Sequence, residues 1–198
     1  AGNPDYLDEL EAYAIQTQVP IIRKEMQSFM RTMLLMNKPK RILEVGTAIG
    51  FSALLMSEFM PQDGHITTIE NYEKRIPIAR ANFQKYRKED RITLLEGDAA
   101  EVLKTLEGPY DFIFMDAAKG QYIHYLPQIM RILTPGGVLI SDNVMQDGDI
   151  IESKYAITRR DRTIHRRMRE YLYTLTHHEG LQTSILTLGD GVAVSVRK

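Results

Sequence analysis

Short apolar runs alternate with longer helical patterns along this chain, and this alternation constrains the fold more than any other feature. Runs typical of buried strands occupy residues 41–46, 65–70, 91–98, 110–116 and 136–143. Between them, apolar residues recur at helical spacing over 52–59, 73–86, 99–106 and 122–133. Strands that alternate with helices predict an open α/β sheet with right-handed crossovers and mostly parallel strands.

Two further segments flank this alternating region. Residues 5–37 carry apolar side chains at spacings of three and four, so we expect an N-terminal helical cap over 1–37. A polar, basic helix is expected over 153–176, and it is followed by two alternating runs joined by Gly189, Asp190 and Gly191. Asp-Gly between alternating runs predicts a hairpin, whose last strand is antiparallel to its neighbours. Because no linker interrupts the 198 residues, we expect a single domain over 1–198.

Composition excludes several classes of protein. The longest apolar runs fall far short of the roughly 20 residues that a membrane span needs. The chain has no cysteine, which excludes a disulfide framework, and acidic residues from Asp5 onward interrupt any signal peptide, so we expect the cytoplasm. The formal net charge of −1 provides no overall field for nucleic acid, which would need a local basic patch.

An acidic residue stands at the end of every predicted strand. These residues are Glu44, Glu70, Asp98, Asp116 and Asp142. In open α/β sheets ligands bind beyond the carboxyl ends of the strands, so the set favours a ligand site. The alternative is that such a residue caps the following helix, and for Asp98 taken alone this is an equally good interpretation.

The turn after the first run reads E-x-G-x-x-x-G, with Glu44, Gly46 and Gly50. It lacks both the third glycine of the dinucleotide fingerprint and the lysine of a phosphate loop, which disfavours a dehydrogenase or an ATPase. Glu44 disfavours a phosphate and suits a cationic ligand, whereas Glu70 suits ribose hydroxyls and Asp98 an exocyclic amine. Adenine, ribose and a cationic amino-acid tail together describe S-adenosylmethionine.

Three oxygen donors follow two strands that we expect to be neighbours. Asp116, Asp142 and Asn143 offer two carboxylates and an amide without any His or Cys, which suits Mg²⁺ or Mn²⁺ better than zinc. The alternative is a helix cap at Asp116 and a polar turn at Asp142. Lys119 could take the proton of an acceptor hydroxyl or stabilise its oxyanion, although most lysines are simply solvated.

The stretches ILEVGTAIGFSALLM, TIE, EGDA, FMDAAKGQY and GGVLISDNV resemble the metal-dependent O-methyltransferases of the catechol and caffeoyl-CoA type over residues 17–198. The resemblance implies a Rossmann-like α/β sheet of seven strands, mostly parallel with the last strand antiparallel and with helices on both faces. It implies cofactor contacts from Ile22, Glu44, Gly46, Ser52, Glu70, Asp98, Ala99 and Asp116. It also implies that Asp116, Asp142 and Asn143 bind the metal, and that Lys119 and Asp116 are catalytic. Ala118 stands where plant relatives carry a second acid, so their additional substrate contacts are not expected here.

Two classes of acceptor with adjacent oxygens remain. One is a small catechol or phenylpropanoid, and the other is 5-hydroxyuridine at the tRNA wobble position, which would become 5-methoxyuridine. Seven basic residues against one acid lie between Lys154 and Arg169, and the candidate tRNA contacts among them are Arg159, Arg160, Arg162, Arg166 and Arg167. The sequence resembles bacterial tRNA 5-hydroxyuridine methyltransferases, which places tRNA first.

Two simpler alternatives stay open, one for the basic helix and one for the function of the chain. The basic helix could be a solvated face or face a partner subunit, and the chain could be a cofactor-binding module without catalysis. The methionine-rich N-terminal helices suit a homodimer as well as they suit a core.

Overall fold

The structure is a computed structural model that describes residues 2–145 and 162–198. The chain divides into two compact units, Ala1–Val102 and Leu103–Lys198, and each is described by itself. The single domain expected over 1–198 stays a prediction. Across the described residues, no helix combines the length and the apolar character that crossing a membrane requires.

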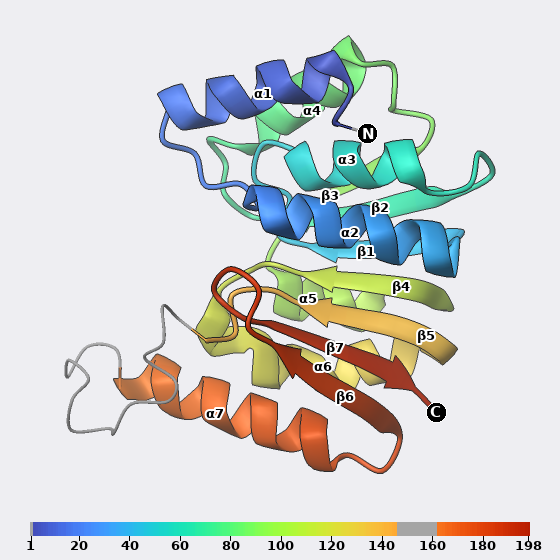
Figure 1. Cartoon of the computed structure of the whole chain (residues 1–198), viewed down its shortest axis with the longest axis vertical. Coiled ribbons are helices and arrows are strands. Elements are labelled where there is room, and N and C mark those ends of the chain that lie inside the picture. The colour runs from blue at the N-terminus through green and yellow to red at the C-terminus, as the bar shows by residue number, and fades with distance from the viewer. Residues whose placement is uncertain (1, 146–161) are drawn as a thin grey trace. The chain divides into compact units, whose positions relative to one another are not determined.

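The first unit contains three parallel strands and the helices that connect them (Figure 1). Its elements are α1 (Asp5–Gln16), α2 (Lys24–Asn37), β1 (Arg41–Val45), α3 (Phe51–Phe59), β2 (His65–Glu70), α4 (Ile76–Lys85) and β3 (Ile92–Glu96). Helix α5 (Ala99–Thr105) crosses into the second unit. Strand β2 pairs in parallel with β1 on one side and with β3 on the other, as the alternation of strands and helices predicts.

Within its described residues, 103–145 and 162–198, the second unit contains four strands. Its elements are β4 (Tyr110–Met115), the 3₁₀ turn η1 (Lys119–Gln121), α6 (Tyr122–Ile132), β5 (Leu133–Ser141), α7 (Arg162–His177), β6 (Leu181–Leu186) and β7 (Val192–Arg197). Strands β4 and β5 are parallel, and β7 is antiparallel to both β5 and β6, which confirms the predicted hairpin. Of the basic helix expected over 153–176, residues 153–161 lie outside the described residues, and the rest is α7.

The strands supply the core of each unit. Leu43 and Val45 on β1 and Phe114 and Met115 on β4 are inaccessible to solvent, because both faces of these strands are covered. A parallel strand covered on both faces has no polar side, which is why these segments are continuous apolar runs rather than alternating ones. A carboxylate within such a run therefore needs a special explanation.

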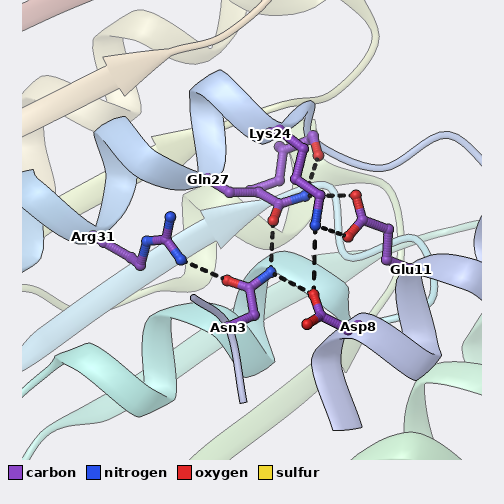
Figure 2. A network of polar contacts seen from close by, with 7 residues as sticks. Asn3, Asp8, Glu11, Lys24, Gln27 and Arg31 are labelled. Atoms are coloured by element: carbon purple, nitrogen blue, oxygen red, sulfur yellow. Dashed lines mark hydrogen bonds and ion pairs between the residues drawn. The ribbon is translucent and has the colours of Figure 1, made fainter. Parts of the chain in front are cut away.

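A polar network fastens the N-terminal helices (Figure 2). Gln27 on α2 is buried; its Nε2 donates to the carbonyl of Ile22 at 3.0 Å, and its Oε1 accepts a hydrogen bond from Asn3 at 2.7 Å. Lys24 forms an ion pair with Glu11 on α1. The network fixes the segment between α1 and α2, which carries the buried Ile22.

Replacing Gly50 with alanine should destabilise the protein more than replacing Gly136. Both glycines have positive φ, +86° and +77°, so each alanine should cost about 1 kcal/mol of backbone energy. At Gly50 the new Cβ would also lie 2.5 Å from Cε1 of the buried Phe83, whereas nothing lies within 4 Å at Gly136.

We therefore expect Gly50→Ala to lose about 1–3 kcal/mol more than Gly136→Ala in urea unfolding. Equal losses for the two variants would contradict the tight packing of the loop against Phe83.

Candidate functional site

The loop after β1 turns sharply over the end of β2. Gly46, Ala48 and Gly50 all have positive φ, at 107°, 48° and 86°. The backbone N–H groups of Gly46 and Thr47 donate to the carbonyl of Ile69 at 3.1 and 3.2 Å. This turn brings the backbone of the loop close to the residue that follows Ile69, which is Glu70.

Glu44 is a fully buried carboxylate on β1. The hydroxyl of Ser52, in the first turn of α3, donates to its Oε1, and the hydroxyl of Thr68 donates to its Oε2 at 2.5 Å. Because Thr68 has only one hydroxyl proton, the Thr47 hydroxyl, 2.6 Å away, must donate to Thr68. A buried carboxylate is tolerable only with such donors, and they fix its position.

Glu70 holds the same loop from the end of β2. Its Oε2 accepts the N–H of Ala48 at 2.7 Å, and its Oε1 accepts the N–H groups of Asn71 and Tyr72 at 2.9 Å. The bond from Ala48 holds this residue in the left-handed region, which costs a non-glycine residue of the order of 1–3 kcal/mol, and the other two bonds hold the turn after β2. The predicted contact of Glu70 with ribose hydroxyls stays a prediction, beside this structural role.

Asp98 caps a helix. Its Oδ1 accepts the N–H of Ala100 at 2.8 Å at the start of α5, which is the alternative that the sequence left open. The side chain of Asp98 is exposed, and Ala99 beside it is half-buried. The adenine contacts of both residues stay predictions.

The predicted metal ligands of the second unit come together. Asp116 and Asp142 directly follow Met115 and Ser141, which are partners in the register of β4 and β5. The amide Nδ2 of Asn143 donates to Oδ1 of Asp116 at 3.0 Å, and the backbone N–H of Asn143 donates to Oδ1 of Asp142 at 2.8 Å. Asn143 has φ +58°, a conformation that Asn tolerates better than most residues.

Burial and mutual repulsion perturb the two aspartates. Burial, together with the negative charge of Asp116, raises the pKa of Asp142 to about 7. Burial also raises the pKa of Asp116, while the hydrogen bond from Asn143 and the positive charge of Lys119 oppose this. Such a pair of carboxylates, with an amide beside it, fits a hard divalent cation that would relieve the repulsion.

No cluster of three His, Cys, Asp or Glu side chains that could hold a metal occurs among residues 2–145 and 162–198. The sequence predicts the amide oxygen of Asn143 as the third protein ligand, and this stays a prediction. That oxygen would face the cation after a rotation of the amide, because the amino group now points at Asp116.

Lys119 begins the 3₁₀ turn that follows Asp116. The side chain is half-buried, and its positive charge lowers the pKa of both Asp116 and Asp142. The lysine is thus part of the same electrostatic cluster as the two aspartates rather than a remote solvated residue.

Sequence reasoning missed two residues that contact the predicted site residues or their backbone, one in each unit. Thr68 pairs in register with Glu44 in the sheet, and only the pairing of β1 with β2 reveals its role. Tyr122 is fully buried, and its hydroxyl lies 3.2 Å from the carbonyl oxygens of Met115 and Asp142. The sequence placed Tyr122 in the stretch FMDAAKGQY but gave no reason to assign it a function.

The turn between β6 and β7 holds the segment that follows Asn143. The N–H of Val144 donates to the carbonyl of Gly191 at 3.0 Å, and the N–H of Met145 donates to that of Asp190 at 2.8 Å. The hairpin thereby fixes the direction in which the chain leaves Asn143.

The predicted tRNA contacts are only partly described. Arg159 and Arg160 lie outside the described residues. Arg162 and Arg166 are exposed on α7, whereas Arg167 is half-buried and its Nη1 donates to the carbonyl of Gly120 at 3.1 Å. Arg167 therefore fastens α7 to the 3₁₀ turn that begins at Lys119, whereas Nη1 of Arg166 lies 3.7 Å from the carboxylate of Glu170.

A cavity of about 420 Å³ opens between α1 and α4 in the first unit. Its lining includes Leu10 and Tyr13 from α1 and Ile78 and Ala81 from α4. None of the predicted cofactor residues lines it, so this cavity is not the predicted cofactor site.

Comparison with known proteins identifies the family. A family model described as O-methyltransferase matches residues 1–198. A catechol O-methyltransferase from Mycobacterium tuberculosis is 34% identical over 164 residues, which cover 79% of this chain and 71% of that protein. The chain therefore belongs to the O-methyltransferase family, which is a class I S-adenosylmethionine-dependent family.

Solved structures agree with this assignment. A crystal structure from Staphylococcus aureus, provisionally described as a caffeoyl-CoA O-methyltransferase, has a TM-score of 0.90 and 31% identity, covering 97% of this chain and 92% of that one. The methyltransferase PaMTH1 of Podospora anserina, solved with SAH bound, has a TM-score of 0.89 and 31% identity, covering 100% and 90% of the two chains. The predicted fold class and the resemblance to O-methyltransferases are confirmed.

Replacing Glu44 with glutamine should weaken cofactor binding. The change keeps the shape of the side chain but removes the buried negative charge that we expect to meet the cationic methionine end. We expect the dissociation constant of S-adenosylmethionine, measured by calorimetry, to rise about tenfold or more.

Glu96→Gln is the matched control, because Glu96 ends β3 in the same unit but is exposed and paired with Arg80. Unchanged affinity in Glu44→Gln, or an equal loss in both variants, would remove Glu44 from the predicted cofactor site.

Proposed function

We propose that this chain transfers a methyl group from S-adenosylmethionine to a hydroxyl of an acceptor that has two adjacent oxygens. The observation that carries the proposal is the convergence of Asp116, Asp142 and Asn143 with Lys119 after β4 and β5. Membership of the O-methyltransferase family supports S-adenosylmethionine as the methyl donor, and this cluster supports an acceptor that reacts through an oxygen atom.

Asp116, Asp142 and Asn143 are the residues that would hold Mg²⁺ or Mn²⁺. Their two carboxylates and one amide match the oxygen preference of these ions, and their charges offset that of the cation. When bound, the ion would lower the pKa of the acceptor hydroxyl and fix the direction of its oxygen. Mg²⁺ and Mn²⁺ take similar oxygen ligands, so these residues suit either ion.

We expect Lys119 to act on the proton of the acceptor hydroxyl. As the bond from the acceptor oxygen to the methyl carbon forms, the bond from that carbon to the sulfonium sulfur breaks, and the hydroxyl proton leaves the acceptor. A neutral Lys119 amine would accept this proton, whereas a charged Lys119 would stabilise the oxyanion. Its electrostatic coupling to Asp116 and Asp142 supports a position close to that oxygen.

A small catechol-type acceptor is the first candidate. The relatives at about a third identity over most of their length are described as catechol O-methyltransferases, and others as caffeoyl-CoA O-methyltransferases. Two vicinal oxygens on one ring suit the proposed site, because both could be held next to the two aspartates.

A wobble-position 5-hydroxyuridine of tRNA is the second candidate. Its support is the exposure of Arg162 and Arg166 on α7, together with the contact of α7 with the 3₁₀ turn that begins at Lys119. Exposed arginines next to a site are suited to phosphates. The relatives do not carry this specificity in their descriptions, so it is placed second.

One assay separates the two acceptors. The protein would be incubated with labelled S-adenosylmethionine and Mg²⁺, and with either catechol, a phenylpropanoid ester or tRNA that contains 5-hydroxyuridine. Label in the small phenols, at rates that salt hardly changes, supports the first candidate, and label in tRNA supports the second. Transfer to none of these acceptors would overturn the proposal.

Asp142→Asn should abolish turnover without loss of cofactor affinity. The amide removes one of two carboxylates, so we expect kcat to fall on the order of a hundredfold or more with the preferred acceptor. Asp63→Asn is the control, because Asp63 is an exposed aspartate paired with Lys40. Normal turnover of Asp142→Asn at every Mg²⁺ concentration would remove the metal from the proposal.

Replacing Arg162 and Arg166 with glutamine tests the tRNA candidate. If α7 contacts phosphates, tRNA affinity should fall and the slope of log K against log salt should decrease by about 1–2. Arg80→Gln on α4 removes an exposed arginine elsewhere and serves as the control. An unchanged salt slope would mean that these arginines of α7 only face solvent and do not contact tRNA phosphates.

A homodimer is also proposed, on narrower grounds than the methionine pattern suggested. Met26 and Met30 are buried in the first unit and belong to its core, whereas Leu35 and Met36 at the end of α2 are 59% and 74% exposed. Exposed apolar side chains of this size support a contact with another chain. Light scattering would test it, and a monomeric mass would exclude the dimer.

A further inference from the structure

We propose that Tyr122 is a positioning residue that sets the affinity of the site for its divalent cation, by pinning the two strand ends that carry Asp116, Asp142 and Asn143. This inference rests on the proposed function, because it assumes that these three residues bind a cation.

The hydroxyl of Tyr122 lies where three backbone groups meet. Tyr122 is the first residue of α6, and its side chain is inaccessible to solvent. The hydroxyl oxygen is 3.2 Å from the carbonyl oxygens of Met115 and Asp142, and the N–H of Ala117 donates to it, also at 3.2 Å. A phenol has one proton to donate and can accept hydrogen bonds, so it serves both carbonyls in turn and accepts from the amide.

Each of these three groups borders a proposed ligand. Met115 and Ala117 are the chain neighbours of Asp116, one on either side. The carbonyl of Asp142 belongs to the peptide bond that leads to Asn143. One hydroxyl therefore restrains the backbone around Asp116 and the backbone that orients Asp142 and Asn143.

A structural role as core filler does not require this hydroxyl. A phenylalanine would fill the same volume, and a fully buried hydroxyl costs free energy unless it is bonded. Direct pairing of the strands already joins the two ends through the N–H of Asp142 and the carbonyl of Met115, at 3.0 Å. The hydroxyl of Tyr122 adds the restraint on Ala117, which sheet pairing does not reach.

Tyr171 provides a matched comparison within the same unit. It is also fully buried, and its ring packs edge-on against that of Tyr122 at 5.5 Å between centroids. Its hydroxyl, however, bonds the side chain of Ser141 at 2.6 Å and not the backbone around the ligands. Removing either hydroxyl deletes a buried polar group, but only Tyr122 restrains the ligand-bearing backbone.

The test compares Tyr122→Phe and Tyr171→Phe with the unaltered protein. Mn²⁺ binding is titrated by electron paramagnetic resonance, cofactor affinity by calorimetry, and folding by circular dichroism, at a temperature at which both variants are fully folded. We expect the Mn²⁺ dissociation constant to rise about tenfold or more in Tyr122→Phe and less than about threefold in Tyr171→Phe. Cofactor affinity should be the same in all three proteins.

Steady-state kinetics add a second readout. In Tyr122→Phe the Mg²⁺ concentration for half-maximal activity should rise, while kcat at saturating Mg²⁺ should recover. A fall of kcat that no Mg²⁺ concentration restores, or Mn²⁺ affinity equal to that of the unaltered protein, would overturn the inference and leave the proposed function intact. If the unaltered protein itself binds no Mn²⁺, the proposed function fails before either variant is measured.

Discussion

Carboxylates buried at the ends of apolar strands are the constraint on which the rest of this structure depends. Such a group can stay only where donors are arranged around it. Glu44 has two hydroxyl donors, and Glu70 has three backbone N–H donors. The left-handed backbone of the loop at Ala48 makes sense as the conformation that brings the N–H of this residue to Glu70.

The two units satisfy this constraint differently. In the first unit the buried carboxylates of Glu44 and Glu70 accept hydrogen bonds from protein donors, which fix their positions. In the second unit Asp116 and Asp142 repel each other, and burial pushes the pKa of Asp142 to about 7. The hydrogen bond from Asn143 and the charge of Lys119 only partly offset the cost for Asp116. Such an incompletely compensated pair of carboxylates is consistent with the proposed cation site.

Much of this could be predicted from the sequence because the signals are local. The apolar runs predict the order of strands β1 to β5, although β5 begins at Leu133, within the helix expected over 122–133, and ends at Ser141. The residue at the end of each run lies near the carboxyl end of its strand. The features that the sequence did not predict depend on contacts between distant segments. Thr68 reaches Glu44 only through the register of β1 and β2. Tyr122 matters because of three backbone atoms that no pattern of side chains encodes. Asp98 shows a local signal with two meanings, since a helix cap and a ligand use the same carboxylate.

The hairpin turn at Asp190 and Gly191, which holds Val144 and Met145, also bears on biosynthesis. A nascent chain emerges from the ribosome in sequence order, so Asp116, Asp142 and Asn143 are all exposed to the cell before that turn exists. Until then the chain after Asn143 lacks its anchor, and the growing polypeptide should capture an ion poorly.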